Sequence, residues 1–241
     1  MSLFLPVTEV EHYTDTLFRI RTERPSSYRY TAGQFTMIGM GDDDINRAYS
    51  YTSGPYDDYI EFYSIKVPNG PLTSRLQHVK PGDTIEVGDR PTGTLTLANL
   101  ELGGNLWMFA TGTGIAPFIS LLRDPETHSS FDTVNAVWSV RTNRELDAYH
   151  SFLQETLGTR YYPTVTQEQP QSGVHSGRIQ EHIERDTFWK YIRPDSDKVM
   201  LCGSIDFNRD LKQYFLDIGF TEGNKKTAGT LVQEKAFVSR T

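Results

Sequence analysis

The chain has 241 residues, 37% of them hydrophobic, which is enough for one large or two modest domains with true cores. Its 24 basic and 31 acidic side chains give a formal net charge of -7 and form no long basic run, which argues against a nucleic-acid-binding protein. The single cysteine, Cys202, cannot supply an iron–sulfur cluster, a zinc knuckle or an internal disulfide. Any redox chemistry would therefore need a bound organic cofactor.

The N-terminal segment does not resemble a signal peptide. Residues 1–10 have no cationic start, and Pro6 and Glu9 interrupt their short apolar patch. No apolar run in the chain approaches the length of about 18 residues that suggests a membrane-spanning helix. We therefore expect no membrane interaction and a cytoplasmic location.

The first hundred residues alternate apolar and polar positions between turn signals. The clearest alternating segments are residues 16–21, 59–65 and 84–87. Turns at Ala32-Gly33, Pro81-Gly82-Asp83 and Pro91-Thr92-Gly93 separate such segments. Many short strands at this spacing predict a closed or nearly closed antiparallel barrel over residues 1–99.

The pattern changes after a linker at residues 100–105, which contains Gly103 and Gly104. A continuous apolar run at residues 106–110 is typical of a strand that is buried on both faces. Three later segments also run into a polar turn and then a helix-like segment: residues 133–140, 161–165 and 199–202. Alternating strands and helices predict a parallel α/β sheet of the nucleotide-binding kind over residues 100–241.

A cation, an aromatic ring and a hydroxyl follow one another at Arg47, Tyr49 and Ser50. A guanidinium can bind a phosphate through two hydrogen bonds, and a tyrosine ring offers a face on which a flat tricyclic ring system could stack. The Ser50 hydroxyl can hydrogen-bond a ring nitrogen that gains or loses a hydride. Because Tyr51 alternates with Tyr49, we expect both rings to point toward a common cleft. The alternative is a barrel strand with an exposed arginine and two half-buried tyrosines.

A second motif, residues 70–76, predicts a short helix that starts at Pro71. Gly70 would allow the tight entry, and Thr73 and Ser74 would place hydroxyls in the first turn. The free backbone N–H groups at such a terminus can bind pyrophosphate. A capped helical turn that closes the barrel would look almost the same.

A third motif, residues 112–118, follows a buried strand and opens a helix that runs to about Arg123. A glycine-rich phosphate loop requires this context, although Pro117 replaces the third glycine of the usual dinucleotide fingerprint. A plain junction between a strand, a turn and a helix is the alternative.

Small polar groups follow the last strand of the α/β half at Cys202 and Ser204, where ligands bind in α/β proteins. Cys202 could instead be a buried core thiol. Arg141, Arg144 and Arg178 lie after strands or in polar loops, where they could bind the phosphate of a dinucleotide or simply face solvent. The six histidines show no ligand spacing, so we expect no metal site.

Together these residues resemble the ferredoxin–NADP reductase family, in particular its compact bacterial ferredoxin/flavodoxin–NADP reductases, over essentially the whole chain. The resemblance implies a six-stranded Greek-key barrel that holds FAD at residues 1–99 and a Rossmann-like domain that binds NADP(H) at residues 100–241. It implies hydride exchange between NADPH and flavin N5, followed by one-electron transfer with ferredoxin or flavodoxin as transient partners. We expect a monomer.

By this resemblance, Arg47 contacts the flavin phosphate, Tyr49 stacks on the isoalloxazine and Ser50 approaches N5. The other flavin-binding positions that it implies are Ala48, Ile65, Val67, Gly70, Leu72, Thr73 and Ser74. Ferredoxin and flavodoxin are acidic, so we expect a local basic patch despite the net charge. Its candidate residues are Arg24, Arg29, Arg75, Lys225 and Lys226.

On the nucleotide side, Thr113 would lie between flavin and nicotinamide, and Cys202 at the nicotinamide pocket. The nucleotide-binding positions are Thr113, Gly114, Arg141, Arg178, Gly203 and Ser204. We take Glu234 as a candidate proton donor, which completes a catalytic set of Tyr49, Ser50, Cys202 and Glu234. The tail resembles that of one bacterial subgroup, in which Ala236 would cover the flavin and Phe237 would meet the adenine. Phe237 could instead pack on the core.

Two departures from the family pattern bear on NADPH preference. Gln167 stands where relatives commonly have an arginine for the 2'-phosphate, and Asp206 adds a carboxylate that would repel this phosphate if it pointed inward. Two other functions fit the same motifs: an NAD(P)H:flavin reductase that releases reduced flavin, and a catalytically silent flavin- and nucleotide-binding electron-transfer subunit. A reductase component of an oxygenase usually carries an iron–sulfur segment, which a single cysteine cannot ligate.

Overall fold

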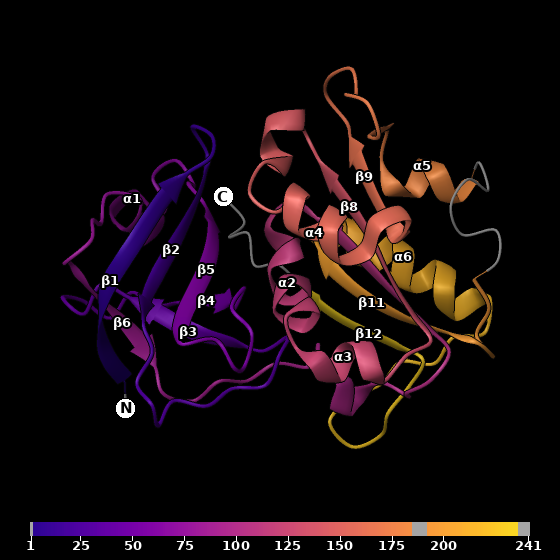
Figure 1. The fold of residues 1–241 in the computed structure, drawn as a ribbon, viewed down its shortest axis with the longest axis horizontal. Coiled ribbons are helices and arrows are strands. Elements are labelled where there is room, and N and C mark those ends of the chain that lie inside the picture. Colours follow the sequence, from indigo (N-terminus) through magenta and orange to yellow (C-terminus); the bar gives the residue numbers. More distant parts are fainter. Residues whose placement is uncertain (1, 185–191, 236–241) are drawn as a thin grey trace. The chain divides into compact units, whose positions relative to one another are not determined.

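The computed structural model describes residues 2–184 and 192–235 (Figure 1). Contacts divide the chain into two compact units. The barrel unit comprises residues 1–93 and 116–124, and the sheet unit comprises residues 94–115 and 125–241. The border between the units therefore falls a few residues before the expected border after residue 99, and one helix from the α/β half of the sequence groups with the barrel.

Hydrogen bonds account for the placement of residues 94–99 in the sheet unit. The hydroxyl of Thr94 donates to the carbonyl of Gln233 at 3.2 Å, and the amide of Gly229 donates to the carbonyl of Asn99 at 3.2 Å. These bonds bring the segment beside the last strand of the sheet. The assignment of FAD to residues 1–99 and of NADP to residues 100–241 stays a prediction.

The barrel unit contains six antiparallel strands and two short helices. They are β1 (Ser2–His12), β2 (Leu17–Glu23), β3 (Phe35–Gly39), β4 (Arg47–Ser50), β5 (Tyr59–Ile65), β6 (Thr84–Gly88), α1 (Thr73–Leu76) and α2 (Ala116–Leu122). The strand order is β4-β3-β6-β1-β2-β5, and a bridge between Tyr51 and Phe62 joins the end of β4 to β5. The sheet is thus a nearly closed barrel, which confirms the expected architecture.

Period-two alternation places the apolar side chains of these strands inside the barrel. In β1, Leu5 and Val7 are buried while Pro6 between them is exposed, and in β6, Ile85 and Val87 are buried. Pro6 points away from the core, and its two neighbours, Leu5 and Val7, make the contacts with the barrel interior. The N-terminal segment, which the sequence pattern left unassigned, is therefore a long strand that pairs with both β2 and β6.

Within its described residues, the sheet unit contains six parallel strands. They are β7 (Asn105–Thr111), β8 (Thr133–Val140), β9 (Tyr161–Val165), β10 (His175–Ser176), β11 (Asp197–Gly203) and β12 (Leu231–Lys235), in the order β10-β9-β8-β7-β11-β12. Because β8, β9 and β10 lie on one side of β7 and β11 lies on the other, the order of strands reverses between β7 and β11. Open parallel sheets bind ligands beyond the carboxyl ends of strands at such a switch point.

The helices found among the described residues of the sheet unit are α3 (Pro125–Ser129), α4 (His150–Leu157), α5 (Ile179–Glu184) and α6 (Ile205–Asp217), with 3-10 turns η1 (Leu97–Asn99), η2 (Gly112–Ile115), η3 (Asn143–Leu146) and η4 (Gly158–Arg160). In α6, Phe207, Leu211 and Phe215 recur every four residues and pack into one buried cluster with Phe109 and Val199 of the sheet. No helix in the described part of the chain is both long and apolar enough to cross a membrane.

Candidate active site

Arg47 begins β4, and its guanidinium is exposed and available to an anion. Strand β4 pairs with β3, so that Tyr49 lies opposite Thr36 and Ser50 opposite Phe35. The guanidinium of Arg47 donates to the carbonyl of the neighbouring Asn46 at 2.8 Å and meets no carboxylate among the described residues. An arginine without an acidic partner is suited to a phosphate that arrives with a ligand.

Tyr49 is held at two places. Its hydroxyl accepts a hydrogen bond from the Ser64 hydroxyl at 3.2 Å, and its ring meets Phe62 edge-on, with centroids 6.3 Å apart. Burial raises the pKa of Tyr49, although the hydrogen bond from Ser64 and the charge of Arg47 act in the opposite direction. The half-buried Ser50 has a hydroxyl with no partner among the described residues, so it can bond to a ligand.

Tyr51 does not share an open cleft with Tyr49. Its side chain is fully buried in the barrel core, where its hydroxyl lies 2.6 Å from the hydroxyl of Tyr28 and its ring stacks on Tyr30 at 3.9 Å. The expectation of two rings facing one cleft was therefore wrong for Tyr51. Period-two alternation puts both tyrosines on the inner side, and the deeper of the two is enclosed by other aromatic rings.

The loop after β5 is closed by Thr73. The amide of Val67 donates to the Thr73 hydroxyl at 3.2 Å, and this hydroxyl donates to the carbonyl of Val67 at 3.3 Å. A Cβ on Gly70 would overlap the Thr73 hydroxyl, so this turn requires glycine. The Thr73 hydroxyl therefore forms its hydrogen bonds within the loop, whereas the hydroxyl of Ser74 has no partner among the described residues.

Helix α1 begins at Thr73 rather than at Pro71. The amide of Ser74 bonds to the carbonyl of Gly70 at 3.1 Å, four residues back, whereas the amide of Arg75 bonds to the carbonyl of Leu72 at 3.0 Å, three residues back, so the first turn is irregular. The remaining barrel positions of the expected flavin set are Ala48 and Ile65, which are half-buried, and Leu72, which is buried.

In the sheet unit, the glycine turn at the end of β7 packs directly against the end of β11. Gly112 has a φ of 53°, and its carbonyl accepts a hydrogen bond from the Trp138 indole at 2.9 Å. A Cβ on Gly114 would overlap the carbonyl oxygen of Cys202, and a Cβ on Gly203 would overlap the Thr111 hydroxyl. Gly114 therefore packs against backbone and Gly203 against the side chains of Thr111 and Phe207, and a side chain on either glycine would prevent this packing.

The hydroxyls of Thr113 and Ser204, both at this switch point, differ in whether they already have a hydrogen-bond partner. The half-buried Thr113 has a hydroxyl with no partner among the described residues. Ser204 caps α6, because its hydroxyl accepts from the amide of Phe207 at 3.3 Å, and its own amide donates to the Thr111 hydroxyl at 3.2 Å. Thr113 can thus offer a hydroxyl to a ligand, whereas the hydroxyl of Ser204 is already used.

Cys202 and Glu234 lie side by side on β11 and β12, where they are register partners. Burial raises the pKa of the Cys202 thiol, and the nearby Glu234 carboxylate adds to this effect, so the thiol is neutral. Burial raises the pKa of Glu234 to about 7, against the opposing effect of the backbone amides of Thr94 and Leu95 and the charge of Lys225. Glu234 can therefore hold a proton near neutral pH, and Cys202 cannot act as a thiolate nucleophile.

The edge of the sheet beyond β8, β9 and β10 carries the predicted arginines. Arg141 follows β8 and Arg178 follows β10, and both guanidinium groups are exposed and unpaired within the described chain. The amide of Gln167, which follows β9, donates to the carbonyl of Arg141 at 2.9 Å. Three adjacent strand ends therefore bring Arg141, Gln167 and Arg178 to one edge.

Two carboxylates, Glu168 after β9 and Asp206 after β11, already have partners. Glu168 accepts from the side-chain amide of Asn143 at 2.6 Å, and Asp206 pairs with Arg209 at 2.6 Å. The charge of Asp206 is therefore partly balanced. Ala236 and Phe237 lie outside the described residues.

Comparisons with known proteins agree with this architecture. The model of an oxidoreductase NAD-binding domain matches residues 108–213. The chain is 43% identical to the flavodoxin/ferredoxin–NADP reductase of Rhodobacter capsulatus, over 96% of this chain and 92% of the relative. It is 42% identical to ferredoxin–NADP reductase A of Sorangium cellulosum, over 96% of this chain and 88% of the relative. The chain belongs to the bacterial ferredoxin/flavodoxin–NADP reductase family.

A solved member of this reductase family shares this two-part fold. The ferredoxin–NADP reductase of Neisseria gonorrhoeae, described with bound FAD and NADP, matches with a TM-score of 0.89 and 31% identity over 98% of this chain and 99% of that one. The two-part fold class expected from the sequence, a β-barrel followed by a parallel α/β domain, is thereby confirmed.

Three residues that hold candidate site residues in place were missed from the sequence: Ser64, Trp138 and Thr111. Each acts through a partner distant in the chain: Ser64 on Tyr49, Trp138 on Gly112, and Thr111 on Ser204. Serine, threonine and tryptophan occur in many strands without a functional role. Only the folded structure shows which distant backbone or hydroxyl group each of them hydrogen-bonds.

Proposed function

We propose that this chain is an FAD-dependent reductase that exchanges a hydride with NADPH and single electrons with ferredoxin or flavodoxin. The observation that carries the proposal is the likeness to named reductases over nearly the whole chain, because it spans both the barrel and the parallel sheet. The names of the relatives supply the activity and the two carriers, and the Neisseria structure supplies the two cofactors. A monomeric state and a cytoplasmic location belong to the same proposal.

The barrel unit offers groups that fit a flavin nucleotide. Arg47 carries a charge with no carboxylate partner in the described chain, and the hydroxyls of Ser50 and Ser74 are likewise unpaired. Arg47 would hold the phosphate, Tyr49 would present its ring to the flavin, and Ser50 would donate to a ring nitrogen. Gly70 would let the backbone approach closely. FAD bound here would supply the two-electron and one-electron chemistry that side chains lack.

The sheet unit offers groups that fit a pyridine dinucleotide. Thr113 and the glycine turn lie at the switch point, where pyrophosphate binds in such sheets. Arg141 and Arg178 would share the 2'-phosphate of NADPH from two strand ends, in place of the arginine that Gln167 lacks. The Asp206 carboxylate is exposed and pairs with Arg209, so solvent screening limits its repulsion of a phosphate.

Within the catalytic set, Glu234 and Cys202 would have different tasks. Glu234, with its pKa raised to about 7, would hold or release a proton beside Cys202. Cys202 would stay a neutral thiol that shapes the pocket, because its pKa is raised by burial. Tyr49 and Ser50 would orient the flavin ring.

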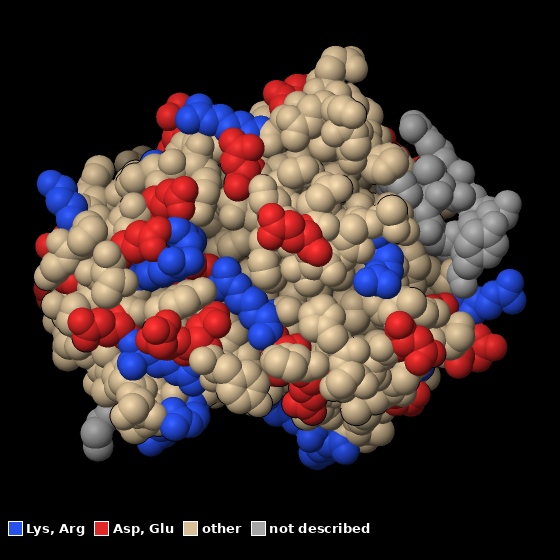
Figure 2. Space-filling model, in the orientation of Figure 1, with Lys and Arg blue, Asp and Glu red and all other residues tan. Residues whose placement is uncertain are grey.

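The expected basic patch for an acidic carrier receives limited support. Arg75 pairs with Asp42 at 2.8 Å and with Asp43 at 2.6 Å, and Arg24 donates to the carbonyls of Tyr28 and Asp57. Figure 2 shows basic and acidic side chains intermingled over the visible face. Recognition of an acidic carrier would therefore depend on a few individual basic side chains and not on a large basic patch.

The experiment that tests this function is anaerobic stopped flow with NADPH and, separately, with NADH. Rapid loss of flavin absorbance with NADPH, much slower with NADH, supports the proposal. Release of the reduced flavin would support a flavin reductase instead, and failure of both nucleotides would overturn the proposal. Arg141→Ala should raise the KM for NADPH, whereas Arg160→Ala should not, because Arg160 precedes β9 at the opposite edge of the sheet.

A further inference from the structure

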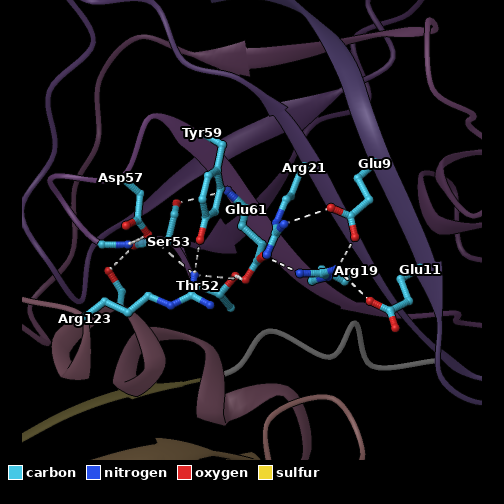
Figure 3. A network of polar contacts seen from close by, with 12 residues as sticks. Glu9, Glu11, Arg19, Arg21, Thr52, Ser53, Asp57, Tyr59, Glu61 and Arg123 are labelled. Carbon is cyan, nitrogen blue, oxygen red and sulfur yellow. Dashed lines mark hydrogen bonds and ion pairs between the residues drawn. The ribbon is translucent and has the colours of Figure 1, made fainter. Parts of the chain in front are cut away.

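A buried carboxylate lies at the centre of an ionic network in the barrel unit (Figure 3). The side chain of Glu61, on β5, is 0% exposed. Its oxygens lie 2.8 Å from the Arg19 guanidinium, 2.6 Å from that of Arg21 and 3.3 Å from that of Arg123. The hydroxyl of Thr52 donates to the same carboxylate at 2.8 Å. Three guanidinium groups thus converge on one acid.

The charges of this network favour the ionised form of Glu61. Arg19 also pairs with Glu9 and Glu11, and Arg21 pairs with Glu9 at 2.8 Å. Burial alone would raise the pKa of Glu61, but the charges of Arg123 and Arg19 and the hydrogen bonds from Arg21 and Thr52 together outweigh burial, and the pKa lies below its ordinary value. Glu61 therefore acts as a fixed negative charge and not as a proton donor.

Arg123 differs from the other two arginines because it follows α2, whereas Arg19 and Arg21 lie on β2. Its guanidinium also donates to the Tyr59 hydroxyl at 3.0 Å. One turn earlier, the hydroxyl of Ser120 donates to the carbonyl of Ser53 at 2.7 Å. A Cβ on the neighbouring Gly54 would come within 2.8 Å of the Arg123 Cβ. Helix α2 is therefore fastened to the barrel at two points and at close range.

We propose that Glu61 and Arg123 are positioning residues for the pyridine-nucleotide turn. Turn η2 ends at Ile115, and α2 begins at the next residue, Ala116. A helix that is fixed by a buried ion pair fixes the end of the turn to which it is joined by one peptide bond. The nucleotide part of this inference rests on the function proposed above, whereas the fastening of α2 does not.

The chain offers a matched pair of variants for the test. Arg123→Gln and Arg21→Gln each remove one guanidinium from Glu61, but only Arg123 belongs to the α2 segment. Hydrogen exchange by mass spectrometry, on the purified flavoprotein, reports the opening of residues 116–123. We expect Arg123→Gln to speed exchange there about tenfold or more, since a charged hydrogen bond is lost. Arg21→Gln should leave this segment unchanged, and Arg123→Lys should restore part of the protection.

Kinetics then test the link to the turn. Arg123→Gln should raise the KM for NADPH at least about fivefold, with kcat and flavin content unchanged, and Arg21→Gln should not. Equal effects of the two variants on KM and exchange would overturn the proposal, because they would indicate a purely structural network. Unchanged exchange in Arg123→Gln would also overturn it. A parent protein that does not react with NADPH would instead refute the proposed function, and the exchange result would still stand.

Discussion

The carboxyl group of Glu234 should titrate near neutral pH. Burial raises its pKa to about 7, although the amide of Thr94, 3.4 Å from Oε2, the amide of Leu95 and the charge of Lys225 all act to lower it. Replacement by glutamine removes the titration and keeps the shape of the side chain. Glu234→Gln therefore isolates the free energy that ionisation of this carboxyl costs the folded protein.

The magnitude follows from the difference between a folded pKa of about 7 and an ordinary value of 4.5. At 1.36 kcal/mol for each pKa unit, the difference corresponds to about 3 kcal/mol. As pH rises from 4.5 to 7, the unfolded chain loses this proton while the folded chain keeps it, so the free energy of unfolding falls. Below about pH 4.5 both states are protonated and the carboxyl has no effect. Glu234→Gln should thus be the more stable protein at pH 8, by up to about 3 kcal/mol.

Two measurements check this prediction. Carbon-13 NMR of glutamate-labelled protein, with Glu234→Gln to assign the signal, gives the pKa directly. Urea unfolding of both proteins at pH 5 and pH 8 gives the difference in stability, most of which should appear between these two values. A Glu234 signal that titrates below about pH 5, or a stability difference that is equal at both pH values, would refute the reasoning.

Three further predictions concern the switch point of the sheet unit. Gly114→Ala should lower the free energy of unfolding by about 1–3 kcal/mol in urea, because the new Cβ overlaps the Cys202 carbonyl; unchanged stability would contradict the close backbone contact. Cys202 should react with a thiol reagent at pH 8 only after unfolding, because its raised pKa and burial keep it a shielded thiol, so fast labelling of the native protein would contradict this. Trp138→Phe should cost about 1–3 kcal/mol, because the Gly112 carbonyl loses its donor, and Trp107→Phe, as the control, should cost less.

Much of the fold could be predicted from local pattern. Residues 59–65, 133–140 and 161–165 form strands with the expected limits, because each apolar run ends where polar or glycine residues begin. Strands β1 and β12 were not predicted. In β1, Pro6 and Glu9 broke the apolar pattern, but pairing with β2 and β6 on its two sides stabilises the strand.

The site was less predictable, because its supporting contacts join distant residues. The sequence placed Thr73 as a free hydroxyl, whereas the fold uses this group to close the loop onto Val67. Tyr51 seemed equivalent to Tyr49 by alternation, yet the core encloses it. Local pattern shows which face a side chain takes, but not which group from another strand reaches it first.

The barrel unit is built from two separate segments of the chain, residues 1–93 and 116–124, and this limits how its halves can be exchanged with those of other proteins. A gene fragment that ends after residue 93 or 99 omits α2, so Glu61 would lose the guanidinium of Arg123, and Ser53 the hydroxyl of Ser120. Because Glu61 would keep Arg19 and Arg21, the loss of Arg123 corresponds to one charged hydrogen bond, which typically contributes about 1.5–3 kcal/mol. A chimaera can exchange the α/β half for that of another reductase. Its residues 116–124 would then have to come from the same protein as the barrel, although the sequence on both sides of them comes from the other protein.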